Sequence, residues 1–285
     1  MRGQPGDIDE GGRLNELANF SDDATTEVWS AILARLLVFP GYRDAFAAAY
    51  PEVPATELGI IHVARAIVAF ELHLWELADS AFDHYLGSVS IPGNDFLIDA
   101  QALEGARLFI GDAGCVRCHA GALFTDEQFH NIGVPPMGEG RGPDGLDEGR
   151  MEVTGVASDR FRFRTPPLRN VALTPPYMHN GAYTDLTEVI EHHLHPEAAL
   201  ARYDGGHVPS DIEVHRDRFG EVLEDLDPEL APPRELTSDE IFMLVRFLES
   251  LSSEVELTVP DRPGAGIPLT VPSGLPVHLA TPDVH

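Results

Sequence analysis

The amino-acid sequence predicts an all-α fold, and three observations lead to that prediction. Apolar residues recur at three- and four-residue steps in segments towards both ends of the chain. Two of those segments open with the capping-box pattern, in which Asp or Thr precedes Glu by three positions. Between residues 133 and 176, glycine and proline are dense and the alternation typical of strands is absent. We therefore expect helices joined by long loops.

The first third of the chain predicts a small helical unit. Pro40-Gly41 ends the first helix, and Pro92-Gly93-Asn94 separates this unit from the next helix. That next helix delivers the chain to a glycine-containing turn at residues 111–114. The helices expected here cover residues 25–39, 42–50, about 56–79 and about 96–110.

The second half predicts two more helices and a tail. Asp185 with Glu188 opens a helix over residues 185–194, and Thr237 with Glu240 opens another near residues 238–251. Beyond residue 254 repeated prolines prevent continuous helix or central strand, so an extended segment is expected. The predicted organisation is a helical unit over residues 1–90, a domain over 91–255 and a Pro-rich extended tail over 256–285.

Composition narrows the classes of function. The 285 residues include 47 acidic side chains and 19 basic ones, and every basic one is arginine. The formal net charge is −28. Nucleic acid is excluded as an expected partner, since phosphate binding needs a basic surface. Only two cysteines occur, so neither a disulfide framework nor a four-cysteine metal cage is expected within the chain. No run approaches the length of a membrane span, and residues 1–12 do not resemble a signal peptide.

The two cysteines form one motif, Cys115-Val116-Arg117-Cys118-His119. In c-type haem attachment, two thiols at this spacing bind the haem edge covalently and the adjacent histidine ligates the iron. A redox dithiol would need a thioredoxin-like βαβ context, and a zinc site would need further cysteines. The sequence therefore predicts one haem c, bound through Cys115, Cys118 and His119, in a class I cytochrome c-like haem domain with long wrapping loops.

A second axial ligand is expected from the helix over residues 185–194. Its apolar positions leave His193 on the inward face and His192 on the outward face. Met178 is the alternative ligand, because it lies in a stiff proline-containing loop and methionine is common opposite histidine in electron-transfer cytochromes. Met137 is less suited, since it lies too close to the haem motif. The second axial position of the iron could also stay open for peroxide or another small ligand.

Other polar residues have two interpretations each. Arg164 and Arg169 flank a proline pair in the wrapping loop and suit haem propionates, or they pair with the acidic surface. His130 and His179 could form hydrogen bonds near the haem. The remaining histidines considered are expected to be solvated: His192, His195, His207 and His215.

Several motifs together resemble the C-terminal haem domain of bacterial di-haem cytochrome c peroxidases and of the related di-haem oxidoreductase that matures methylamine dehydrogenase. The resemblance extends from about residue 15 to residue 251. It is clearest in residues 114–119, 129–135, 164–174 and 176–181. In that family the second ligand of this haem is a methionine or tyrosine one helix after a Pro-Tyr-X-His motif, and alignment on Leu186 places His193 there.

The resemblance implies further partners and ligands. Family members hold calcium between their domains with carbonyls that correspond to Thr174 and Pro176, plus an asparagine that has no counterpart here, which argues against calcium. They also carry an upstream haem where peroxide reacts, and often form dimers. No upstream attachment motif precedes residue 15. Two explanations are open: truncation, which would have removed an N-terminal haem domain and its export signal, or descent to a single-haem protein. A periplasmic location is expected.

Three functions follow from these expectations. The first is the electron-accepting part of a peroxidase that reduces hydrogen peroxide with electrons from a small cytochrome c or cupredoxin. The second is a stand-alone monohaem electron-transfer cytochrome. The third is oxidation of a protein partner, which the replacement of the family's tyrosine ligand by His193 makes a weaker analogy.

Overall fold

Helices dominate the chain in the computed structural model, which describes residues 15–21, 24–74, 80–88, 98–140, 142, 145–230 and 235–253. The prediction of a mainly helical fold is confirmed. The described residues divide into an N-terminal unit, residues 15–74, and a C-terminal unit, residues 80–253, in which the haem motif lies. Among the described residues, no helix is both long and apolar enough to cross a membrane.

The N-terminal unit contains a short 3₁₀ turn, η1 (Glu16–Asn19), and the helices α1 (Thr25–Leu37), α2 (Pro40–Ala49) and α3 (Ile60–Leu74). Pro40 was expected only to end a helix, but it is also the first residue of α2. Proline suits that position because the first helical N–H has no partner within the helix. Helix α3 begins at Ile60, later than expected, and residues 75–79 of the predicted helix lie outside the described residues.

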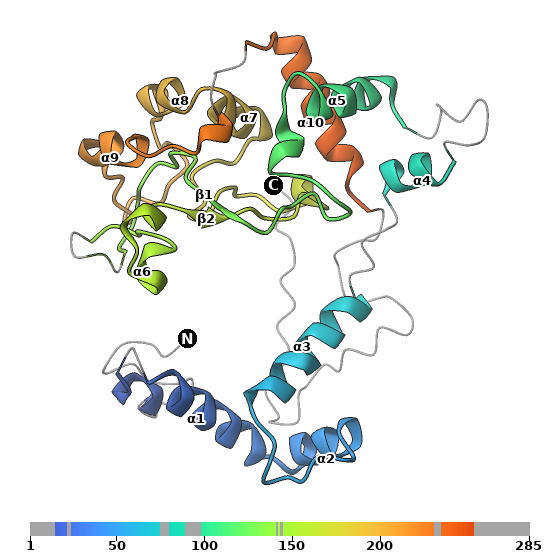
Figure 1. Ribbon diagram of the computed structural model, residues 1–285, viewed down its shortest axis with the longest axis vertical. Helices are drawn as coiled ribbons and strands as arrows, with labels where there is room; N and C mark the ends of the chain where they lie inside the picture. The colour runs from blue at the N-terminus through green and yellow to red at the C-terminus, as the bar shows by residue number, and fades with distance from the viewer. Residues whose placement is uncertain are drawn as a thin grey trace. The chain divides into compact units, whose positions relative to one another are not determined.

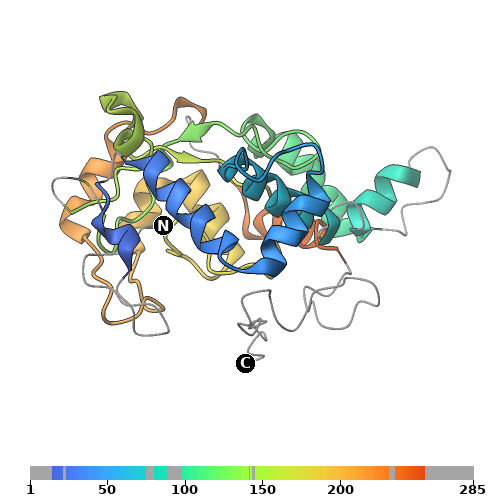
Figure 2. The same cartoon turned by 90° about the horizontal axis from the view of Figure 1, so that it is seen from below.

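The core of the C-terminal unit forms between two helices far apart in the sequence. Helices α5 (Ala100–Ile110) and α10 (Ser238–Ser250) lie side by side in both views (Figure 1, Figure 2). Phe109, Leu244 and Phe247 are almost completely buried between them. The capping box predicted at Thr237 is present, with the Glu240 amide 3.2 Å from the Thr237 hydroxyl oxygen.

Helix α4 (Ala81–Ser88) belongs to this second core. The Phe82 ring lies 5.2 Å from the Phe247 ring, centroid to centroid, in an edge-to-face arrangement. The predicted boundary at residue 90 therefore falls after α4, whereas the contacts of α4 place it with the haem motif. The predicted tail over residues 256–285 lies outside the described residues.

The loops between α5 and α10 carry short elements, as the glycine and proline content predicted. A two-stranded antiparallel sheet pairs β1 (Phe129–His130) with β2 (Phe163–Arg164). Helix α7 (Leu186–Leu194) has Asp185 as its N-cap, as expected. Helices α8 (Pro196–Arg202) and α9 (Phe219–Leu223) were not predicted. The remaining short elements are η3 (Cys115–Arg117), α6 (Met151–Thr154), η4 (Ala157–Asp159), η5 (Val171–Leu173), η6 (Arg216–Arg218) and η7 (Pro228–Leu230).

Candidate haem site

A single tight turn gathers the cysteines and the first histidine. Gly114 precedes η3 with a left-handed backbone, φ 65°, which glycine adopts without steric cost. The Cys118 and His119 amides both donate to the Cys115 carbonyl, at 3.2 and 2.8 Å. Both cysteine side chains are half-buried. Burial raises the pKa of the Cys118 thiol to about 11. The turn thus presents two thiols and one imidazole from five consecutive residues.

His119 is held in one tautomer by the loop that follows it. Its Nδ1 lies 3.0 Å from the Phe124 carbonyl oxygen, and a carbonyl can only accept a hydrogen bond. Nδ1 therefore carries the proton and Nε2 keeps its lone pair. Burial, followed by the neighbouring His193, lowers the pKa of His119 to about 4. Neutral imidazole with an available Nε2 is the form that binds metals.

His193 on α7 mirrors this arrangement. Its Nδ1 lies 2.7 Å from the Val189 carbonyl oxygen, one turn back on the same helix, so Nε2 is again the available nitrogen. Burial lowers the pKa of His193. The His193 and His119 ring centroids are 6.4 Å apart. The structure therefore brings together the two histidines that motif and helix periodicity selected separately.

This spacing can be tested against one iron held between two histidines. A metal–imidazole bond of about 2 Å, and about 1.1 Å from ring nitrogen to ring centre, give a centroid separation of about 6 Å. The observed 6.4 Å fits that span. The residues present therefore fit a haem iron with two axial histidines, although ligation itself stays a prediction.

His192 was expected to face solvent, and this expectation is wrong. His192 is fully buried, at 0% exposure. Its Nε2 lies 2.8 Å from the Ile132 carbonyl oxygen, so its Nδ1 accepts a hydrogen bond from the Tyr183 hydroxyl at 2.9 Å. The reason is that α7 packs on two sides: Ile190 faces the α5–α10 core, and Val189 faces a second cluster around Tyr183.

Met178, the alternative axial ligand, packs against that second cluster, which includes Val134, Ala182 and Tyr203. Its backbone has φ 70°, an uncommon value for a residue other than glycine. The His193 ring, by contrast, lies 6.4 Å from the His119 ring, centroid to centroid. The geometry thus favours His193 over Met178.

The two loop arginines pair with carboxylates, which was one of their two interpretations. Arg164 lies 3.5 Å from Glu127, and both side chains are exposed. Arg169 binds Asp83 through both of its terminal nitrogens, at 2.7 and 2.8 Å. Contact of either guanidinium with a haem propionate stays a prediction, and Arg169 is largely committed to Asp83.

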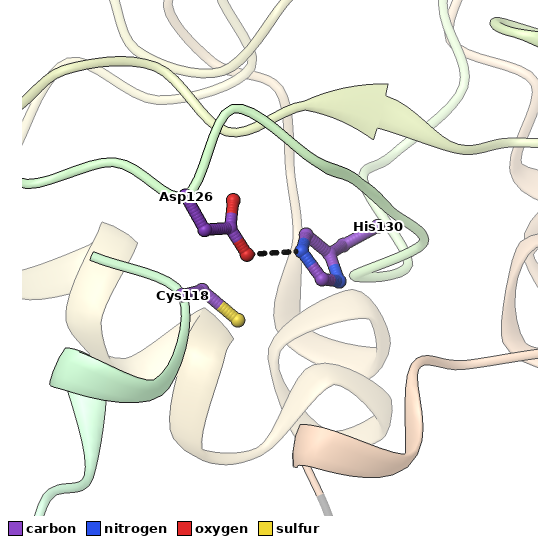
Figure 3. Close-up of side chains that lie close together, drawn as sticks. All are labelled: Cys118, Asp126 and His130. Carbon is purple, nitrogen blue, oxygen red and sulfur yellow. Dashed lines mark hydrogen bonds and ion pairs between the residues drawn. The ribbon is translucent and has the colours of Figure 1, made fainter. Parts of the chain in front are cut away.

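His130 lies beside the haem motif in an ion-pair network that sequence reasoning did not foresee. Its two ring nitrogens lie 2.9 Å from Asp126 and 2.7 Å from Asp227, and Figure 3 shows Asp126 and His130 facing each other near Cys118. Arg162 also contacts Asp227, at 3.1 Å. Although burial alone would lower it, these carboxylates raise the pKa of His130.

This network bears on whether Cys118, Asp126 and His130 could hold a metal ion. Their ligand atoms lie within 4.8 Å of one another. An imidazolium that donates from both nitrogens has no lone pair for a metal, so the group is better described as an ion-pair network. No sequence signal could have found Asp227, which is 97 residues away from His130.

The other motif histidine, His179, stacks on the Phe163 ring, with centroids 3.4 Å apart.

Comparison with known proteins identifies relatives of the chain. MauG, the methylamine utilization protein of Methylorubrum extorquens, is 30% identical over 234 residues, which is 81% of this chain and 55% of MauG. The cytochrome c551 peroxidase of Pseudomonas aeruginosa is 36% identical over 151 residues, 53% of this chain and 41% of the relative. A solved MauG-like protein associated with microbial copper homeostasis superposes with a TM-score of 0.55 at 28% identity, covering 82% of this chain and 64% of that one.

The chain belongs to the family of di-haem cytochrome c peroxidases and MauG. The fold agrees with that of the diheme peroxidase BthA from Burkholderia thailandensis, with a TM-score of 0.54 at 21% identity, covering 86% of this chain and 61% of BthA. No family model matches the sequence. The chain spans about half the length of the curated relatives MauG and cytochrome c551 peroxidase.

Membership in this haem-containing peroxidase family leaves the calcium expectation untested. Thr174 and Pro176 lie exposed in the loop between η5 and α7. Within the described part of the chain, the close group of potential side-chain ligands is the one at Cys118, Asp126 and His130, not one near this loop. Calcium is not part of the function proposed below.

Proposed function

We propose that this chain binds one haem c as an electron relay in a peroxide-reducing di-haem enzyme. The observation that carries the proposal is the pair of imidazole rings of His119 and His193, 6.4 Å apart, each with its Nδ1 proton directed at a backbone carbonyl. Cys115 and Cys118 would hold the haem covalently. His119 and His193 would both hold the iron, so this site would serve electron transfer, and we assign peroxide chemistry to a second haem domain.

The bound haem would supply reversible one-electron chemistry, and the chain's residues set its conditions. The Nδ1–H groups of His119 and His193 donate to carbonyls, which fixes both rings and raises the basicity of Nε2. Two histidines favour a lower reduction potential than a histidine–methionine pair, since a thioether favours reduced iron. The site is thus arranged to pass electrons without large structural change.

The overall reaction balances as one hydrogen peroxide, two electrons and two protons giving two waters. We assign the electrons to a small donor protein, a cytochrome c or a cupredoxin, and the location to the periplasm, as the family resemblance implies. The names of the relatives support peroxidase chemistry, since several are cytochrome c peroxidases. Homodimerisation is part of the same family expectation.

Substitution of the second ligand tests the proposal. Exported protein carrying His193→Ala should keep its covalent haem but change from low-spin to high-spin iron, because one axial nitrogen is lost. Electronic absorption and electron paramagnetic resonance spectra measure this change. Met178→Leu is the matched control and should leave the low-spin spectrum unaltered. An unaltered spectrum in His193→Ala with a changed one in Met178→Leu would assign the ligand to Met178 instead, and absence of covalent haem in the parent chain would refute the proposal.

A second candidate is a stand-alone monohaem electron-transfer cytochrome. The observation in its favour is the same pair of histidines, His119 and His193, because a haem held by two histidines suits electron transfer without substrate chemistry. The two functions differ in the full-length gene product: a second Cys-X-X-Cys-His motif with rapid peroxide turnover supports the peroxidase. One haem per chain and no turnover with a reduced donor would support the cytochrome.

A further inference from the structure

All three nitrogens of the Arg169 guanidinium form hydrogen bonds, and one of these bonds goes to the loop that follows His119. Nε donates to the Ala122 carbonyl at 2.7 Å, and the two terminal nitrogens donate to the two carboxylate oxygens of Asp83 at 2.7 and 2.8 Å. Only 9% of the Arg169 side chain and 15% of the Asp83 side chain are exposed. A bidentate pair fixes the plane of the guanidinium as well as its position. Asp83 thereby sets the direction in which Arg169 presents Nε.

The loop that Arg169 holds is the one that orients His119. Phe124, whose carbonyl accepts the Nδ1 proton of His119, has a left-handed backbone with φ 56°. That conformation is costly for a residue with a side chain and persists only when the surroundings impose it. The neighbouring Ala122 carbonyl is bound by Arg169, and the Leu123 carbonyl by the Leu168 amide at 3.2 Å.

The Phe124 ring is fixed as well. It packs against Phe82, Phe109 and Phe247 with centroids 6.0, 6.1 and 6.0 Å away, and the Arg169 guanidinium carbon lies 5.6 Å from its centre. Arg169 therefore contacts the loop at two points, one residue either side of Leu123. The Arg169 side chain thus supplies both the hydrogen bond to the Ala122 carbonyl and the cation near the Phe124 ring.

We propose that Arg169, oriented by Asp83, is a positioning residue that aims the Phe124 carbonyl at His119 and so sets the reduction potential of the haem. The inference rests on the proposed function, because it needs His119 as an axial ligand. Asp83 lies on α4, which adds a role for that helix beyond packing: it supplies the anion that holds Arg169. Neither residue contacts the imidazole itself, and both act through the loop.

The sign of the effect follows from the hydrogen bond. When Nδ1–H donates strongly to a carbonyl, the imidazole becomes a better electron donor to iron and the oxidised state is stabilised. Release of residues 122–124 from Arg169 weakens this bond, so the reduced state is relatively favoured. Loss of the pair should thus shift the midpoint potential in the positive direction.

The test compares Arg169→Gln, Asp83→Asn and the double variant in the haem-loaded chain by redox titration. Both single variants should shift the potential positively, and the double variant should shift it no further than the larger single effect, because both changes disrupt one unit. Glu127→Gln, which removes the partner of exposed Arg164 on the same wrapping loop, is the control and should leave the potential unchanged. Unshifted potentials in Arg169→Gln and Asp83→Asn, or fully additive shifts, would overturn the inference.

Hydrogen exchange supplies a readout independent of the redox titration. The Thr125 and Asp126 amides donate to the Ala120 and Cys118 carbonyls at 2.9 and 2.8 Å, within the loop that Arg169 holds. Both amides should exchange faster in the variants than in the parent, and unaltered exchange would count against positioning. If Arg169→Gln fails to fold, Arg169→Lys replaces it: it keeps the charge beside Asp83, loses the Nε donor and should still shift the potential positively.

The outcomes separate this inference from the proposed function. A parent chain without two histidine ligands would refute the proposed function, whatever the variants do. A parent chain with low-spin bis-histidine haem, whose potential does not respond to Arg169 or Asp83, would refute only the positioning role.

Discussion

His130 joins two chain segments through charge rather than through apolar packing. Its ring lies between Asp126 in the haem loop and Asp227 near η7, with 17% of the His130 side chain exposed. Its pKa is raised, and the pKa values of Asp126 and Asp227 are lowered by hydrogen bonds that outweigh the effect of burial. The network is therefore most favourable when the imidazole is protonated and both carboxylates are ionised.

The pH dependence of stability follows from these directions. A raised histidine pKa means that stabilisation is complete below the unfolded value of about 6.5 and is lost as pH rises through the folded value. Lowered carboxyl pKa values keep the stabilisation above about pH 4. We expect His130→Gln to lower the free energy of unfolding by about 2 kcal/mol near pH 5.5, the size of hydrogen bonds to charged groups, and by less near pH 9.

Denaturant unfolding at the two pH values measures this difference. The control is His207→Gln, which removes an exposed histidine that contacts the Gly181 carbonyl and reports the general effect of losing a histidine in the same unit. An equal loss of stability for His130→Gln at both pH values would show that protonation of His130 does not contribute.

At the level of elements, the sequence predicted the helix ends that carry capping signals. It did not predict which faces of a helix are buried. Asp185 and Thr237 cap α7 and α10 as their sequences indicated, because capping depends on neighbouring residues. His192 was assigned to solvent because periodicity describes one buried stripe, whereas α7 packs between two clusters. Helices α8 and α9 were missed because seven and five residues give too little periodicity to recognise.

The contact between α5 and α10 depends on a glycine. A Cβ placed on Gly105 would lie 1.9 Å from the Met243 carbonyl oxygen, and backbone atoms cannot move aside as a flexible side chain could. We expect Gly105→Ala to force the helices apart and to lower the free energy of unfolding by about 3 kcal/mol, the upper range for overpacked cores. Thermal and denaturant unfolding measure it.

Gly87 on α4 provides the matched control for that substitution. A Cβ there has nothing within 4 Å, so Gly87→Ala should be neutral or stabilise the protein by about 0.5 kcal/mol by restricting the unfolded chain. Similar stabilities for the two alanine variants would mean that the helices do not approach as closely as described.

For the whole molecule, the sequence predicted the haem motif and the second histidine because one is a local pattern and the other lies on a strongly periodic helix. It could not predict what holds them. The partners of Arg169 and His130, Asp83 and Asp227, lie 86 and 97 residues away along the chain. Contacts over such separations are fixed by the fold as a whole, so single-sequence reasoning from spacing and propensity does not reach them.

The net charge of −28 gives a prediction about the electron donor. A field of this sign attracts a basic partner over distances comparable with the Debye length, about 10 Å at 0.1 M salt. We expect the rate constant for reduction by a basic cytochrome c to fall tenfold or more as ionic strength rises from about 0.01 to about 0.15 M. Stopped-flow mixing measures the rate, and an acidic cupredoxin is the control, whose rate should rise instead. A rate with the basic donor that does not depend on salt would exclude steering.

The pairing of α5 with α10 also bears on the order of haem attachment and folding. The cysteine motif follows α5 directly, whereas α10 lies more than a hundred residues further along the chain. The main core of the C-terminal unit cannot close until both helices are present in the same compartment. A chain that enters this compartment unfolded therefore offers Cys115 and Cys118 for covalent attachment before the core behind them is complete.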